Sequence, residues 1–372
     1  MKRFITFLGV LTVFSFGYAQ NYADNSVLSE GKWTKMGIVK PGVYRLEFND
    51  LTTAGLDPNT LSPRNIHIYG NGGGLLPQAN SAARPADLQE VPITVIGEAD
   101  GRFDAILFYA EGSDGYIWNA ESQLLSNEQN LYADTNFYFI TANTLPGKRV
   151  NVLPSEPTGT FDAKAFRGTD FHEVDLESPI ESGRFWLGET FSGALSQRTF
   201  SFYVPDVPST GSVRVTMRVA AASSIPSQFT VTAGGLSPFQ ISINKVIIGA
   251  ETSDNYKLVT NTFAVPQSAL DGDSLRITLD YASTDFQAIG WLDFIDLDFD
   301  QNPTLGPNEG RLLLLADGVG EGEVARVKLQ VADASYNVWN VSDPSNVYAY
   351  EYNLNGSQLS FNMAADSVEF LY

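Results

Sequence analysis

Hydrophobic and polar residues alternate along most of this chain. The alternation is clean over residues 42–48, 64–69 and 106–109, which are rich in β-branched and aromatic side chains. A period of two is typical of β-strands with one face in a core. Glycine, asparagine and aspartate at residues 71–74 and 100–101 supply the positive φ angles that tight turns require. The pattern predicts an all-β protein.

One short helix interrupts this pattern. We predict it over residues 50–54, with Asn49 or Asp50 as its N-terminal cap and Gly55 at its end. Two further candidates, each a helical turn or two, lie at residues 176–182 and 267–270.

Two stretches rich in proline, glycine, asparagine and threonine divide the chain. Residues 151–160 and 301–310 are interpreted as linkers. We therefore expect a β-rich N-terminal domain over residues 20–150, a central jelly-roll-like β-sandwich over residues 161–300 and a β-rich segment over residues 311–372. The runs that predict the sandwich are 198–204, 212–220, 228–232, 239–243, 257–265, 274–281 and 291–299.

The last segment stops inside a predicted strand, at residues 368–372. We interpret the chain as a fragment whose continuation is a further domain. About 60 residues of strand with unpaired edges are marginal alone, so we expect this segment to dock on a neighbouring domain. Its other predicted strands are 311–315, 325–331, 337–341 and 348–352.

The first residues have the pattern of an export signal. Lys2 and Arg3 precede an apolar stretch over residues 4–16, and small residues lead to Ala19. We predict a signal peptide over residues 1–19. The apolar stretch is shorter than the roughly 18 residues that a membrane span needs, and no later segment reaches that length. The protein is therefore expected to be exported, without a transmembrane span.

Composition excludes several classes of function. The formal charge of −20 repels phosphate backbones, which argues against a nucleic-acid partner. The chain has no cysteine, so it has no disulfide and no cysteine nucleophile. Its two histidines, His67 and His172, are the only candidates for imidazole chemistry. We assign no catalytic residue to this chain.

Acidic residues crowd one predicted strand. Asp296, Asp298 and Asp300 are spaced by two, so they share one face and are weak candidates for a calcium site. The spacing fails the calcium-loop pattern, since Gln301 and Pro307 stand where glycine and glutamate belong. We favour a strand whose acidic face lies in solvent, with no cofactor. The core face would consist of Trp291, Ile295, Leu297 and Phe299.

Three smaller motifs have structural interpretations. Asp293 lies on the same predicted face as Trp291, so a buried Asp293 needs backbone donors or a positive partner. The glycine cluster at residues 70–74 lacks the residues of a phosphate-binding loop and predicts a hairpin turn. Asp100 and Asp104 predict a turn stabilised by aspartate side chains.

Both histidines are interpreted as structural. His67 alternates with Ile66 and Ile68, which places it on the outer face of its strand. His172 has acidic neighbours, but the chain has no Gly-x-Ser-x-Gly elbow and no second histidine at zinc-helix spacing. Paired carboxylates for glycoside hydrolysis find no support above background.

Aromatic residues leave two interpretations open. Exposed aromatic side chains on a β-sandwich can stack on sugar rings, whereas buried ones form the core. The sequence does not separate the two roles, although a position in the core is favoured for each tryptophan. The tryptophans concerned are Trp118, Trp186, Trp291 and Trp339.

Runs of residues in a fixed order along the chain resemble the N-terminal region of the type IX secretion system sortases, which are gingipain-type cysteine peptidases. The resemblance covers essentially the whole mature chain. It departs at Asn340 and Ser342, where the family more often has Asp and Thr. The runs are SVLSEGKW (26–33), PGVY (41–44), NIHIYGNGGG (65–74), RP (84–85), DLQE (87–90), DGRFDAILFY (100–109), NLY (130–132), YFIT (138–141), FHE (171–173), SGRFWLGE (182–189), WLDFI (291–295) and VWNVSDP (338–344).

The resemblance implies a cell-surface protein associated with the outer membrane of a Gram-negative bacterium. In the family, a peptidase domain follows this region, removes the C-terminal signal of secreted cargo and attaches the cargo to anionic lipopolysaccharide. That domain is absent here, and no family catalytic residue can be carried over. The implied partners are the outer-membrane barrel protein PorV and secreted cargo.

Three hypotheses follow. The leading one is a non-catalytic scaffold or interaction region of a type IX sortase. The alternative is a secreted glycan-binding β-sandwich module that recognises surface glycan. A hydrolase is the least favoured.

Overall fold

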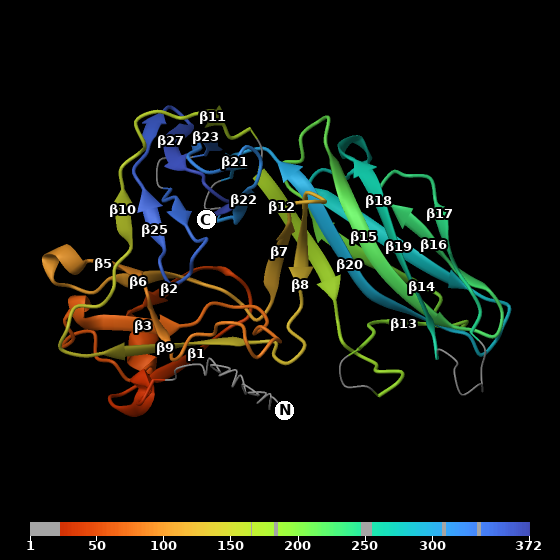
Figure 1. The fold of residues 1–372 in the computed structure, drawn as a ribbon, viewed down its shortest axis with the longest axis horizontal. Helices are drawn as coiled ribbons and strands as arrows, with labels where there is room; N and C mark the ends of the chain where they lie inside the picture. Colours follow the sequence, from red (N-terminus) through yellow and green to blue (C-terminus); the bar gives the residue numbers. More distant parts are fainter. Residues whose placement is uncertain (1–22, 165, 182–184, 247–254, 307–309, 333–335) are drawn as a thin grey trace, which may run out of the picture.

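The computed structural model describes residues 23–164, 166–181, 185–246, 255–306, 310–332 and 336–372. Nearly every element in these ranges is a β-strand, which confirms the all-β, multidomain prediction. The strands gather in an N-terminal region, a central sandwich and a C-terminal region, each with its own hydrophobic core (Figure 1). The predicted signal peptide, residues 1–19, lies outside the described residues.

The N-terminal region packs two antiparallel sheets around one core. Alternation explains this core, because Ile66 and Ile68 of one sheet meet Ile106 and Phe108 of the other. One sheet has the order β1 (Thr34–Ile38), β9 (Asn136–Ala142), β3 (Ile66–Gly70) and β4 (Gln89–Val91), and the other β2 (Gly42–Glu47), β6 (Ala105–Ala110) and β5 (Ile93–Ile96).

The predicted helix is present as α1 (Phe48–Thr53) and ends before Gly55, which has a φ of +76°. The predicted cap is wrong. Strand β2 runs directly into the helix, so Glu47 is the last extended residue and forms a capping box with Asp50. Of the two further helical candidates, residues Gln267–Ala269 form a short 3-10 helix.

The glycine cluster at residues 70–74 is not a hairpin turn, and that prediction is wrong. Strand β3 ends at Gly70, and its partner β4 begins only at Gln89. The glycines instead permit two loops to touch, because a Cβ on Gly73 would lie 2.2 Å from the carbonyl oxygen of Gly112. The Gly73 amide donates a hydrogen bond to the carboxylate of Glu111.

The central sandwich has the strand order of a jelly roll, as the sequence predicts. Most successive strands alternate between two sheets, and the buried side chains of both sheets form one large core. One sheet has the order β12 (Phe166–Glu173), β20 (Ile289–Gln301), β15 (Ser212–Ala222) and β18 (Lys257–Pro266), with β13 (Thr190–Phe191) also beside β20. The other has the order β14 (Gln197–Tyr203), β19 (Ser274–Ala282), β16 (Ser227–Ala233) and β17 (Phe239–Ile243).

Strand β20 carries a bulge at Asp293, opposite Arg218 of β15. A bulge inserts one residue into the ladder and reverses the alternation beyond it. Leu292 therefore joins Ile295 in the sandwich core, while Trp291 packs in a separate small cluster. The prediction that Trp291 and Ile295 share a core face is wrong for this reason.

The C-terminal region packs two small sheets around its own core. One is continuous with the sandwich sheet through β22, which pairs with β12 only between Leu314 and Arg167. The first sheet contains β10 (Asn151–Leu153), β25 (Tyr348–Tyr350), β24 (Trp339–Asn340), β28 (Glu369–Leu371) and β22 (Leu313–Leu315). The second contains β11 (Phe161–Asp162), β23 (Val324–Val331), β27 (Gln358–Ala364), β26 (Asn353–Asn355) and β21 (Thr304–Leu305).

The two predicted linkers are part of this region, so the linker interpretation is wrong. Residues 151–153 form β10, which lies parallel to β25 (Figure 1). The Thr160 amide donates to the carbonyl of Val324 over 2.7 Å. In the second stretch, β20 extends to Gln301 and β21 pairs with β23. Backbone pairing, not composition, decides the structure of these residues.

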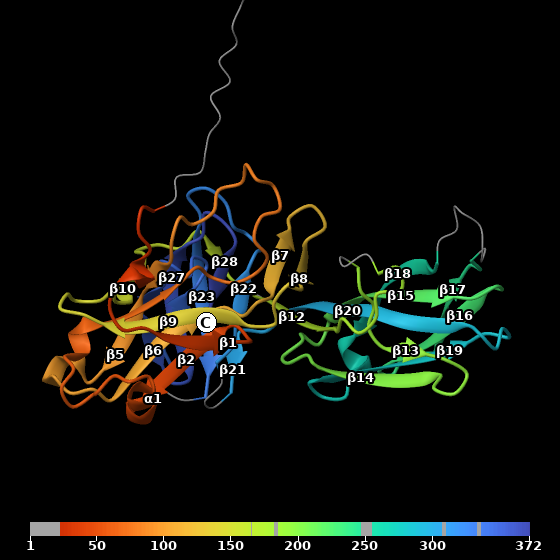
Figure 2. The ribbon, with the colours of Figure 1, turned by 90° about the horizontal axis from the view of Figure 1, so that it is seen from below.

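The three regions form one elongated body, with the sandwich at one end (Figure 2). Tyr109 of the N-terminal region and Trp339 of the C-terminal region meet in a shared apolar cluster. From the N-terminal region, the hairpin of β7 (Gly115–Asn119) and β8 (Leu124–Glu128) reaches the sandwich. Across the described ranges, no helix is both long and apolar enough to cross a membrane.

Candidate functional site

The β7–β8 hairpin covers the outer face of the sandwich at β12 and β20 (Figure 1). This is the face on which the spacing of two places Asp296, Asp298 and Asp300. Asp298 is only 5% exposed, and the other two are half-buried. The prediction of an acidic face in solvent is wrong, because a hairpin from a distant part of the sequence lies over it.

Hydrogen bonds and ion pairs from neighbouring side chains in the described structure satisfy many of the carboxylate oxygens of Asp296, Asp298 and Asp300. The Asn127 amide of β8 donates to Asp296 Oδ1 over 2.7 Å and to Thr169 Oγ1 over 2.8 Å. The guanidinium of Arg167 lies 2.9 Å from Asp300 and 3.7 Å from Asp298. Arg167 thus supplies the positive charge that a calcium ion would otherwise bring. Among the residues that the structure describes, no three acidic or histidine side chains converge as a metal site.

Beside this row, a cavity of about 420 Å³ opens between the hairpin and strands β12, β15 and β20. Its lining includes Gln129, Glu173, Arg214, Arg218, Asp296 and Asp298. Asn127 and Phe294 also line it. Carboxylates, guanidinium groups and amides therefore meet in one partly enclosed space.

Burial shifts the acids of the cavity toward their neutral forms. Loss of hydration raises the pKa of Glu173 to about 7, and the nearby carboxylates of Asp293 and Asp175 add to this rise. Burial raises the pKa of Asp296 to about 6, although hydrogen bonds from Asn127 oppose it. A positive charge placed in the cavity would therefore favour the ionised forms of Glu173 and Asp296.

The bulge residue Asp293 has the partner that the sequence analysis required. Its carboxylate is 3% exposed and is hydrogen-bonded to Arg218 of β15. The guanidinium also lies 4.9 Å from the ring centre of Phe294. The charge of Arg218 is therefore balanced by Asp293, and Arg218 does not fully compensate the negative charge of the other acids in the cavity.

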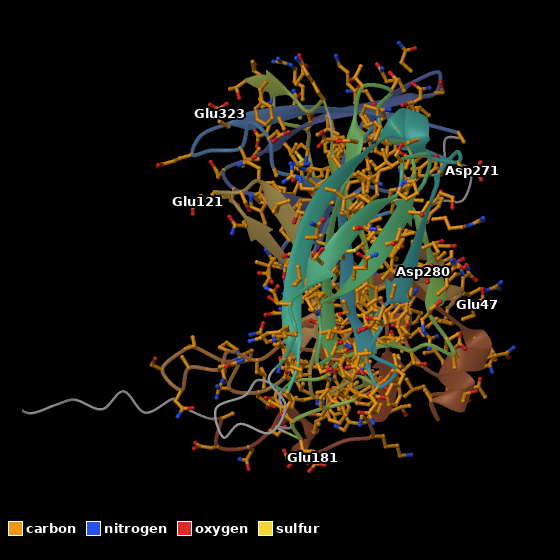
Figure 3. The ribbon with its side chains drawn as sticks, turned by 90° about the vertical axis from the view of Figure 1, so that its right-hand side faces the viewer. Glu47, Glu121, Glu181, Asp271, Asp280 and Glu323 are labelled. Carbon is orange, nitrogen blue, oxygen red and sulfur yellow. The ribbon has the colours of Figure 1, made fainter. Side chains whose placement is uncertain are left out.

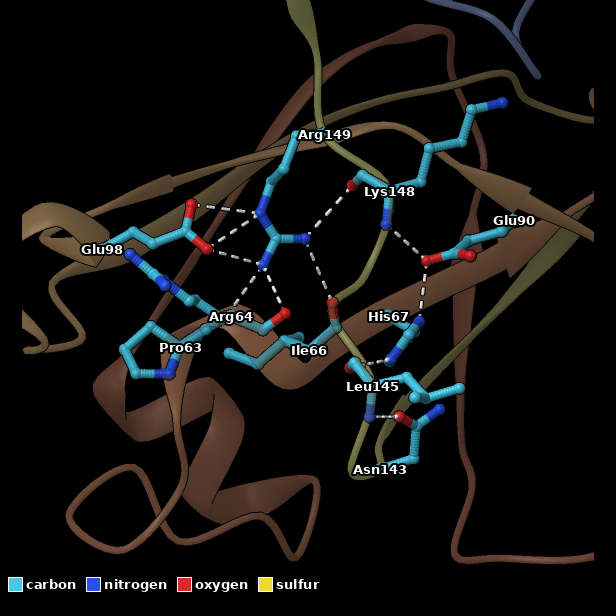
Figure 4. A network of polar contacts seen from close by, with 10 residues as sticks. All are labelled: Pro63, Arg64, Ile66, His67, Glu90, Glu98, Asn143, Leu145, Lys148 and Arg149. Atoms are coloured by element: carbon cyan, nitrogen blue, oxygen red, sulfur yellow. Dashed lines mark hydrogen bonds and ion pairs between the residues drawn. The ribbon is translucent and has the colours of Figure 1, made fainter.

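His67 lies opposite the core residues of β3 but is buried, not exposed as an outer-face position suggests. Its Nδ1 lies 2.7 Å from Glu90 Oε1, and its Nε2 lies 3.1 Å from the carbonyl oxygen of Leu145 (Figure 4). Glu90 also accepts a hydrogen bond from the Lys148 amide. Because both ring nitrogens face acceptors, the hydrogen bond with Glu90 raises the pKa of His67.

His172 pairs with Glu189, from another segment, over 2.7 Å. Its ring lies 4.7 Å from the ring of Phe200. The acidic neighbours in sequence, Glu173 and Asp175, are not its hydrogen-bond partners. These contacts indicate a structural histidine that connects strand β12 to Glu189 and Phe200.

The four tryptophans considered for sugar stacking, out of five in the chain, divide between core and surface. Trp291 and Trp339 are 5% and 4% exposed and pack in apolar clusters. Trp118 is half-buried beneath the guanidinium of Arg167, and Trp186 is 36% exposed. Trp291 and Trp339 are thus unavailable for sugar stacking.

Figure 3, seen from the sandwich end, shows labelled acidic side chains at several separate places on the molecule. The labelled examples are Glu47, Glu121, Glu181, Asp271, Asp280 and Glu323.

Sequence reasoning missed most of the cavity. Gln129, Arg214 and Arg218 carried no recognisable motif, and Glu173 was noted only as a neighbour of His172. Only the fold brings these residues together, because the hairpin crosses onto a different region. No spacing within one strand signals such a site.

Comparisons with known proteins gave a structural match over nearly the whole chain. No family model matches the chain, and no curated protein matches it. Among solved structures, dimeric latent PorU from Porphyromonas gingivalis is similar, with a TM-score of 0.78 and 21% identity over 95% of this chain. The chain spans 33% of that structure's chain. It therefore has the fold of the matched part of PorU.

Two carbohydrate-binding modules are similar only in part. CBM36 in complex with calcium and xylotriose has a TM-score of 0.21 and 14% identity, over 35% of this chain and 89% of that chain. TmCBM61 in complex with beta-1,4-galactotriose has a TM-score of 0.20 and 15% identity, over 34% of this chain and 80% of that chain. Scores this low carry no argument about fold or ligand.

Proposed function

We propose that this chain is the non-catalytic β scaffold of a cell-surface sortase of the type IX secretion system. The observation that carries the proposal is the PorU-like fold over 95% of the chain. The absence of cysteine agrees with it, since a cysteine peptidase needs its nucleophile elsewhere. The scaffold holds a peptidase domain and presents surfaces to other components of the secretion system.

In this proposal, residues 1–19 direct export and are removed, and the rest of the chain resides at the outer membrane. Its partners are the barrel protein PorV and arriving cargo, whose C-terminal signal the complete sortase removes. Cargo is then attached to anionic lipopolysaccharide by the peptidase domain. The sheet that passes from the sandwich into the C-terminal region, joined at the pair Leu314 and Arg167, supports a scaffold role.

Sequencing the gene beyond the codon for Tyr372 tests this proposal. The expected result is a reading frame that continues into a domain with the cysteine and histidine of a peptidase. A stop codon directly after Tyr372, with no peptidase frame downstream, would overturn it.

Glycan binding by the sandwich stays the alternative, and no contact in the described structure favours it. Calorimetry of the whole chain with surface polysaccharide from the source bacterium separates the two proposals. Binding that Trp186→Ala abolishes would support a glycan module. Absence of a heat of binding at millimolar sugar would exclude the glycan-binding alternative and leave the scaffold as the remaining proposal.

A further inference from the structure

The cavity beneath the β7–β8 hairpin contains buried acceptors that no donor satisfies. Asp298 Oδ2 and Gln129 Oε1 are fully buried atoms without a hydrogen bond. The side chain of Asp298 is 95% buried, and its nearest cation, Arg167, is 3.7 Å away. Leaving such atoms unpaired costs roughly 1–3 kcal/mol each, so a donor is expected in the cavity.

Glu173 adds a third acceptor to the same lining. Its carboxylate makes no hydrogen bond or ion pair with any residue that the structure describes. Arg218, the cation closest to its strand position, is already hydrogen-bonded to Asp293. Glu173, Asp298 and Gln129 therefore present acceptors in the cavity lining that lack a hydrogen-bond donor among the described residues.

Arg214 supplies the opposite chemistry at the same cavity. It lines the space and makes no ion pair with a described residue. A free guanidinium beside acidic groups suits a ligand that carries an acceptor, such as a backbone carbonyl, next to its cation. A polypeptide presents both groups at once.

We propose that this cavity binds a lysine or arginine side chain presented by a partner polypeptide. The cationic head lies among Glu173, Asp298 and Gln129, and Arg214 binds a main-chain carbonyl of the partner. The volume of about 420 Å³ far exceeds the roughly 10–15 Å³ that a single water needs. The proposal does not rest on the sortase function and can fail or succeed independently of it.

The acidity of the cavity predicts how binding depends on pH. Because Glu173 and Asp296 have raised pKa values, a cation binds them best once both are ionised, so affinity rises between about pH 5.5 and pH 8. The charged groups around Glu173 are Asp114, Asp175, Asp293 and Arg218. Those around Asp296 and Asp298 are Arg167, Arg214 and Asp300.

Titration of the whole chain with small probes, followed by NMR or calorimetry, tests the proposal. The probes are the Nα-acetyl methylamides of lysine and arginine, and the matched neutral probe is the norleucine derivative. Binding of the basic probes, with none of the norleucine probe, is expected. Equal binding of the neutral probe, or no binding of the basic ones at tens of millimolar, would overturn the proposal.

Variants locate the site. Glu173→Gln should weaken binding of the lysine probe roughly tenfold to a hundredfold, as loss of a charged acceptor does. Gln129→Leu should weaken it less, and Glu128→Gln, in the same hairpin but outside the lining, should leave it unchanged. An unchanged affinity in both Glu173→Gln and Gln129→Leu would contradict the assignment. Spermidine binding as tightly as the lysine probe would overturn the choice of a polypeptide.

Discussion

Several largely buried polar residues connect segments of the described structure that are distant in sequence. Arg167 of β12 meets the acids of β20 and lies over Trp118 of the hairpin. His67 and Glu90 hold the segment around Leu145 against strand β3 (Figure 4). Each contact joins segments that are distant in sequence, so substitution of these residues should change the free energy of unfolding.

His67 predicts a pH dependence of stability. Its pKa is raised in the folded protein, so its contribution is complete below the unfolded value of about 6.5 and is lost as pH rises through the folded pKa. His67→Gln should remove this loss and lower the free energy of unfolding by roughly 1–3 kcal/mol at about pH 6. Urea unfolding at about pH 6 and pH 9 measures both effects. An unchanged alkaline loss in the variant would contradict the assignment.

The bulge pair predicts coupling between Arg218 and Asp293. Asp293→Ala leaves Arg218 without its carboxylate, and we expect a loss of about 1–2 kcal/mol because Arg218 is one-third exposed and water compensates part of the charge. The double variant Arg218→Met, Asp293→Ala should lose less than the sum of the single variants. Denaturant unfolding of the four proteins gives the coupling. Strict additivity would show that the pair contributes nothing.

Among the individual elements, alternation predicted several of the strands that have one solvated face, but it missed β27. Strands β15 and β19 match their predicted runs closely. Strand β12 was missed, because the hairpin covers one face and the polar residues Asp170 and His172 find partners in segments distant in sequence. The bulge in β20 was also beyond prediction, since it is defined only by register with β15.

The candidate site depended even more on tertiary structure. The sequence identified the row of aspartates and the need of Asp293 for a positive partner. It did not reveal that a hairpin turns this row into one wall of a cavity. The proposed linkers failed for a related reason, because proline-rich and glycine-rich composition does not exclude pairing with a distant strand.

Pairing of the first supposed linker predicts slow hydrogen exchange. The Glu156 amide donates to a carbonyl of β27, and the amides of Thr160 and Ala163 donate to carbonyls of β23, at 2.7 to 3.0 Å. A peptide covering residues 151–163 should therefore be protected by orders of magnitude relative to one covering residues 75–81. Hydrogen exchange followed by mass spectrometry measures this. Equally fast exchange in both peptides would restore the linker interpretation.

At the scale of the whole molecule, shared apolar clusters make the N-terminal and C-terminal regions one unit. Trp339 packs in the cluster that contains Tyr109, so Trp339→Ala should cost about 3–5 kcal/mol. The matched control is Trp186→Ala, which removes a partly exposed ring and should cost far less. Thermal unfolding compares the two. Similar losses in both variants would argue against a buried interface between the regions.

We propose that the chain is the scaffold of a type IX sortase. Mass spectrometry of cargo C-termini in the source bacterium, after deletion of the codons for residues 23–372 and with the wild-type gene restored as control, tests this role. Cargo in the deletion strain should retain its C-terminal signal and should not be attached to the surface. Cargo that is trimmed and attached as in the parent strain would contradict the claim.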